Sequence, residues 1–135
     1  MDTRTQSDTV ASVAAAYFVA QAVVGTLLWV AYASSPQMRS WFGLAARPAV
    51  TSSFAWPDLA VIVVASSASA LALAARSRWA VPATALTAGA VLYPTVYLVG
   101  WVATTTGSGG ATLAIMIPPA LLSCWFAWHV ARRLL

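Results

Sequence analysis

The fold of this chain is decided by an uncharged stretch, residues 79–131, which reads WAVPATALTAGAVLYPTVYLVGWVATTTGSGGATLAIMIPPALLSCWFAWHVA. It contains no Asp, Glu, Lys or Arg, and it is more than twice as long as the roughly 20 apolar residues that one helix needs to cross a bilayer. Its middle, residues 104–110, reads TTTGSGG, a polar and glycine-rich sequence that disfavours a helix interior. The stretch therefore predicts two membrane-spanning helices, about 80–103 and 111–133, joined by a short uncharged hairpin.

The composition of the whole chain supports the same class of protein. Of its 135 residues, 61% are hydrophobic and 7% are charged, whereas about a quarter of the residues of a soluble domain are charged. The length fits one domain, residues 1–135. The formal net charge of +4 is scattered along the chain rather than clustered, which argues against a nucleic-acid partner. We expect membrane lipid to surround the protein.

Two further stretches are long enough to cross a membrane. Residues 10–33 are uncharged and end at Ser34-Ser35-Pro36, where proline stops a helix. Residues 58–75 follow Pro57 and are closed by Arg76 and Arg78. The sequence therefore predicts an all-α integral membrane four-helix bundle, with crossings at about 10–33, 58–75, 80–103 and 111–133.

The segment between the first two crossings, residues 35–57, is too polar to cross and unusually apolar for a loop. Ser35 as N-cap and Pro36 at the first helical position predict a helix start. Apolar side chains then recur at helical spacing, at Met38, Trp41, Phe42 and Ala45. This pattern is typical of a short amphipathic helix lying in the headgroup layer.

The distribution of arginine predicts the orientation. After four crossings, one side of the membrane holds Arg4, Arg76, Arg78, Arg132 and Arg133, and the other holds Arg39 and Arg47. The side richer in arginine faces the cytoplasm in most membrane proteins. We therefore expect both termini in the cytoplasm of a prokaryotic cell, with the protein in the cytoplasmic membrane.

Prolines inside the last two crossings suggest a pocket. Pro94, Pro118 and Pro119 cannot donate a backbone hydrogen bond, so they should kink their helices and splay them near mid-membrane. The residues expected to line and close this space are Tyr93, Tyr97, Ser123 and Trp125, with Tyr17 and Gln21 from the first helix. So many polar groups should require a ligand or waters to complete their hydrogen bonds. Plain helix bending explains the prolines equally well.

Asp58 is the acidic residue beyond the N-terminal tail. At the outer mouth of the pocket it could serve as a catalytic general acid or base, although Asp in the first turn of a helix is also favoured by the helix dipole. His129 and Cys124 are the single histidine and the single cysteine. We expect neither a metal site nor a cofactor, because these residues do not form a ligand set.

Three hypotheses for the function follow. The first is binding or carriage of a small lipophilic ligand, such as a quinone, an isoprenoid or a sterol-like molecule. The second is a cofactor-free enzyme of the isomerase, cyclase or hydrolase type, using Asp58 on such a ligand. The third is a structural or transport subunit. Here the small residues of 58–75 would support a homo-oligomer, because small residues let membrane helices approach closely. These residues are Ala65, Ser66, Ser69 and Ala70.

Overall fold

The structure is a computed structural model that describes residues 3–42, 52–53, 55–104 and 109–134. Its elements are α1 (Thr3–Ser34), α2 (Pro36–Phe42), α4 (Ala55–Pro57), the π-helix η1 (Asp58–Val63), α5 (Val64–Ala74), α6 (Ala80–Thr104) and α7 (Gly110–Leu134). Within the described residues, four stretches are long and apolar enough to cross a membrane: Thr9–Ser34, Ala55–Ala74, Ala80–Thr104 and Gly110–Arg133. The predicted all-α four-helix bundle is confirmed, and its helices have the length and composition of an integral membrane protein.

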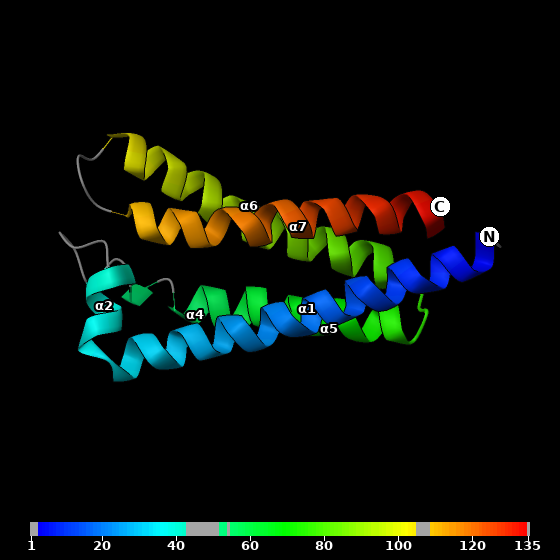
Figure 1. The fold of residues 1–135 in the computed structure, drawn as a ribbon, viewed down its shortest axis with the longest axis horizontal. Helices are drawn as coiled ribbons and strands as arrows, with labels where there is room; N and C mark the ends of the chain where they lie inside the picture. The colour runs from blue at the N-terminus through cyan, green and yellow to red at the C-terminus, as the bar shows by residue number, and fades with distance from the viewer. Residues whose placement is uncertain (1–2, 43–51, 54, 105–108, 135) are drawn as a thin grey trace.

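The long helices run up and down the bundle in turn (Figure 1). Both termini and the turn between α5 and α6 lie at one end, and α2 and α4 lie at the other (Figure 1). The turn after α5 is tight: Ser77 N–H donates to the Ala72 carbonyl at 2.9 Å, and Arg76 N–H donates to the Leu73 carbonyl at 3.1 Å. Arg76 has a φ of 50°. This hydrogen-bond pair with a left-handed residue is the usual way for a helix to end in a sharp reversal.

The helices pack as a ring with one weak seam. α1 packs mainly on α5, α5 on α6, and α6 on α7, whereas α1 meets α7 over a much smaller contact. The apolar core lies toward the termini and consists of Ala14, Phe18, Ala70, Leu73, Ala80, Phe126 and Val130. On the side of this core that faces α2, core residues do not fill the space between α1 and α7. The site described below lies there.

α2 begins as its sequence predicts. The Ser35 hydroxyl accepts a hydrogen bond from the Met38 N–H at 3.3 Å, which is the contact of an N-cap residue. Trp41 is exposed. Ala45 and Arg47 fall in 43–51, outside the described residues. The location of α2 in the headgroup layer stays a prediction.

The small-residue face of α5 packs inside the bundle. Ser66 and Ser69 are fully buried, together with Ala65 and Ala70. The hydroxyls of Ser69 and Thr87 lie 2.8 Å apart and join α5 to α6. These small residues form a close helix contact within one chain, because α1 and α6 cover this face. The homo-oligomer stays a prediction.

Candidate ligand-binding cavity

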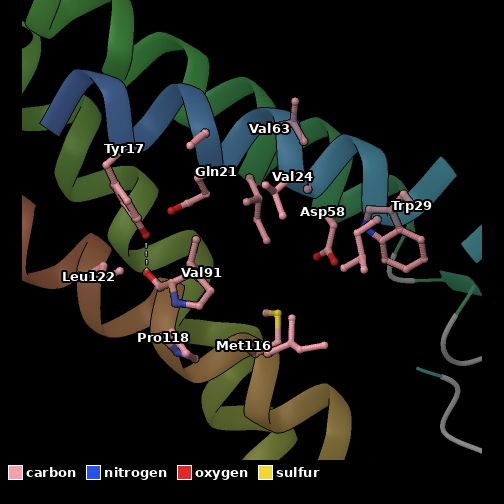
Figure 2. A pocket seen from close by; sticks show the side chains of 16 residues that line it. Tyr17, Gln21, Val24, Trp29, Asp58, Val63, Val91, Met116, Pro118 and Leu122 are labelled. Carbon is pink, nitrogen blue, oxygen red and sulfur yellow. Dashed lines mark hydrogen bonds between the residues drawn. The ribbon is translucent and has the colours of Figure 1, made fainter. Parts of the chain in front are cut away.

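A cavity of about 320 Å³ lies between α1, η1, α6 and α7 (Figure 2). Its walls are largely aliphatic, with Val24 and Leu28 from α1, Ile62 and Val63 from η1, Val91 from α6, and Met116 and Leu122 from α7. Polar side chains in the lining come from Tyr17, Gln21, Trp29 and Asp58. The cavity therefore offers an apolar volume with a few polar groups at fixed positions, as small-molecule sites commonly do.

The cavity opens sideways along the seam between α1 and α7. Val24, Ile115 and Leu122 belong to its lining, yet they are 61%, 41% and 44% exposed. These three side chains therefore stand at a rim on the outer surface of the bundle. In a bilayer this surface faces acyl chains, so a lipophilic molecule could enter without passing through water.

Local sequence features explain why α1 and α7 leave this space. Gly25 has no side chain, and a Cβ placed there would lie 3.6 Å from Cγ2 of Val63, so α1 contacts η1 through backbone at this point. Pro118 and Pro119 sit inside α7 and line the cavity. Each lacks the N–H that would bond to the preceding turn, and proline rings crowd that turn. We attribute the cavity to the missing side chain at Gly25 on α1 and to the missing backbone N–H groups of Pro118 and Pro119 on α7.

The inner end of the cavity is closed by hydrogen bonds among α1, α5 and α7, which we call the polar network. The Tyr17 hydroxyl donates to the Pro119 carbonyl at 2.9 Å, and its oxygen lies 3.0 Å from Oγ of Ser123. The Ser123 hydroxyl donates to Oε1 of Gln21 at 2.9 Å, and Nε2 of Gln21 donates to Ser66 at 3.1 Å. These groups therefore hydrogen-bond one another across three helices, and the expectation that a ligand or waters complete the hydrogen bonding of the pocket stays a prediction.

Asp58 marks the opposite end of the cavity. Its side chain points into the space from the start of η1 (Figure 2). The side chain of Trp29 is its hydrogen-bonding partner. Trp29 lies eight residues after Gln21 on α1, which separates the carboxylate end from the polar network by roughly 12 Å along the helix. The exposed rim of the cavity is formed by Val24, Ile115 and Leu122, so the position of Asp58 at an outer mouth stays a prediction.

The structure does not bring Tyr93, Tyr97 and Trp125 to the cavity. Their side chains are 76%, 45% and 49% exposed, and none lines the space. The physical reason on α6 is its inward face, which is a stripe of small and β-branched residues, Thr84, Thr87, Ala88, Val91 and Thr95. Tyr93 and Tyr97 each follow a member of this stripe by two positions, and two positions turn a helix by about 200°.

Of the residues expected from sequence, the structure places Tyr17, Gln21 and Asp58 in the lining and Ser123 directly behind it. The lining comes mainly from α1, η1 and α7, and α6 contributes Val91. Sequence reasoning missed Trp29 as a site residue. A signal was available, because Trp29 follows Gly25 by four positions and Gly25 follows Gln21 by four, which places all three along one face of α1.

A metal site is not formed by the described residues, among which no three His, Cys, Asp or Glu side chains are grouped closely enough. Cys124 is partly buried. Nδ1 of His129 lies 3.0 Å from the Trp125 carbonyl within the same helix. Neither residue lines the cavity.

Comparison with known proteins gives no relative for this chain. No family model, no curated protein and no solved structure matches it. The function is therefore argued from the cavity itself.

Proposed function

We propose that this protein binds and carries a small lipophilic ligand in the cavity between α1, η1 and α7. The observation that supports this proposal is the aliphatic cavity of about 320 Å³, which falls at the lower end of the roughly 300–1,000 Å³ typical of small-molecule sites. Quinones, isoprenoids and sterol-like molecules share the apolar body that such walls favour. The sideways opening supports carriage, since a ligand dissolved in the bilayer can enter and leave along the seam.

A second candidate function is favoured by the position of one side chain. Asp58 points into the same cavity (Figure 2). A carboxyl group held against a bound molecule can accept or donate a proton during an isomerisation, a cyclisation or a hydrolysis. On this hypothesis the protein is a cofactor-free enzyme. The third hypothesis, a structural or transport subunit, makes no use of the cavity.

The binding proposal is tested by what accompanies the purified protein. The chain is purified into nanodiscs, extracted with organic solvent, and its small molecules are identified by mass spectrometry. Wild type should yield a lipophilic compound that empty nanodiscs lack. Gly25→Phe should lose it, because the ring would fill the cavity. Gly25→Ala is the matched control, since its Cβ makes only an ordinary contact with Val63. Equal extracts from all three proteins would refute the proposal.

The same extraction separates carriage from catalysis. In Asp58→Asn an enzyme would hold unreacted substrate, so the compound recovered would differ chemically from that of wild type. A carrier would hold the same compound, in a changed amount. Recovery of one compound from both proteins therefore argues against the acid–base function of Asp58.

A further inference from the structure

We infer that the ligand of this cavity is a lipophilic organic cation of the alkylammonium type, with Asp58 as its counter-charge and Trp29 as an aromatic wall beside the charge. This inference rests on the proposed binding function. It goes beyond that function because it selects a charged class over the neutral quinones, isoprenoids and sterol-like molecules.

The first step concerns which polar groups remain for a ligand. At the inner end, Tyr17 and Gln21 line the cavity, but Pro119, Ser123 and Ser66 already satisfy them. A ligand placed against them would meet groups already oriented by these bonds, and the remaining N–H and lone pair of Gln21 would give it only neutral contacts. Asp58 differs, because among the described residues the indole of Trp29 is its one side-chain hydrogen-bonding partner, and a carboxylate can accept several hydrogen bonds. The group that can anchor a ligand is therefore the carboxylate.

The second step concerns charge. Among the described residues, no Arg or His side chain lines the cavity. Arg76, Arg78, Arg132 and Arg133 belong to the end of the bundle that holds the termini (Figure 1), and Arg39 is exposed on α2. A carboxylate placed among aliphatic walls is costly unless an opposite charge compensates it. An ammonium group on the ligand would supply this charge, and its alkyl body would occupy the volume lined by Leu28, Ile62 and Met116.

The third step concerns Trp29. Its indole lies beside the Asp58 carboxylate, at the same end of the cavity (Figure 2). An alkylammonium group placed within about 6 Å of an indole face is attracted by the π-electrons. A carboxylate together with an indole therefore recognises the charge and the methyl groups of a quaternary ammonium. A neutral carbonyl compound gains nothing from this pair unless the carboxyl is protonated, and an amide would then serve equally well.

The experiment uses two probes of the same shape, decyltrimethylammonium and its neutral isostere 2,2-dimethyldodecane. The full-length protein is placed in nanodiscs of an uncharged galactolipid, which carries no ammonium group, and binding is measured by native mass spectrometry and by the shift in thermal unfolding temperature. Wild type should bind the cation at least tenfold more tightly than the isostere. Asp58→Asn should abolish this preference, and Asp58→Glu should keep it. Trp29→Phe should weaken cation binding by a few fold.

The control is Asp8→Asn, which removes the same charge from the N-terminal segment of the chain and should leave the preference intact. Equal binding of both probes, lost in Gly25→Phe, would overturn the cation inference and leave the binding function standing. Retention of the cation preference in Asp58→Asn would also overturn it. If wild type binds neither probe, the cation inference fails, and the proposed binding function is decided separately by the extraction of wild type and Gly25→Phe.

Discussion

The Tyr17 side chain packs in the core, lines the cavity and bonds two helices together. Its ring packs against Phe126 with centroids 4.9 Å apart, its edge lines the cavity, and its hydroxyl bonds α1 to α7 across the weakest seam of the bundle. Interhelical hydrogen bonds in membrane proteins contribute about 0.6 kcal/mol on average and up to about 1.7 kcal/mol. The polar network should therefore stabilise the seam modestly and fix the position of α1 more than it raises total stability.

We expect Tyr17→Phe and Ser123→Ala each to lower the free energy of unfolding by about 0.6 to 1.7 kcal/mol. The double variant should lose less than the sum of the two, because the hydroxyls lie 3.0 Å apart and share a contact. Unfolding in mixed micelles, followed by circular dichroism, measures these values. Tyr93→Phe is the control, since its ring is on the outer surface. Strict additivity would show that the two hydroxyls do not interact.

At the scale of the element, α5 shows how a helix with little amphipathic character still selects a face. Ser66 and Ser69 are fully buried against α1 and α6, whereas Ser67 is exposed and its hydroxyl donates to the Val63 carbonyl of its own helix. Hydrocarbon surrounds a membrane helix as favourably as a protein core does, so small side chains decide which face packs. Residue size, more than polarity, orients α5.

This gives a matched pair of substitutions on one helix. Ser69→Leu should destabilise the protein by about 1–3 kcal/mol, because extra methylenes must enter a filled contact and the bond to Thr87 is lost. Ser67→Leu adds the same group toward the outside and should change stability little. Thermal unfolding of both variants in detergent measures the difference. Equal behaviour of the two would mean that the face carrying Ser69 is not packed.

The rule that small side chains decide which helix face packs also explains which features the sequence could predict. The crossings followed from length and charge alone, and Tyr17 and Gln21 of α1 were expected at the pocket because polar groups are costly in hydrocarbon. Tyr93 and Tyr97 were expected at the pocket for their chemistry, but they do not line the cavity, because the inward face of α6 carries the smaller residues Thr87, Val91 and Thr95. The pairing of α1 with α7 depends on long-range packing, which helix periodicity cannot show.

At the scale of the whole molecule, the bundle has a basic end and an open seam. The termini, Arg76 and Arg78 lie at one end (Figure 1), and the cavity opens between α1 and α7 nearer the other, with Asp58 at the side of α2. If the basic end faces the cytoplasm, the charged part of the cavity faces the outer half of the membrane. A ligand would then be collected from, or delivered to, the outer leaflet.

Site-directed labelling tests this orientation. In a Cys124→Ala background, Gln37→Cys should react with an impermeant maleimide added to intact cells, because α2 lies at the end away from the termini. Ser77→Cys, in the turn between α5 and α6, should react only after the membrane is permeabilised. Labelling of Ser77→Cys alone in intact cells would place the termini outside and reverse the proposed leaflet.

The π-helical turn of η1 lets the chain hold one additional residue without changing the face that Asp58 presents. A π-turn closes on the fifth residue instead of the fourth, so it accommodates one inserted residue while the flanking turns keep nearly the same orientation. Asp58 precedes this insertion and the buried serines of α5 follow it. Removing exposed Ala60 should therefore convert η1 to a regular helix and leave the Asp58 carboxylate facing the cavity. Removing exposed Ser67 from the regular helix of α5 should instead turn Asp58 by about 100° relative to Ser69. The acidic end of the site therefore tolerates a change of chain length in η1 that it would not tolerate one or two turns later.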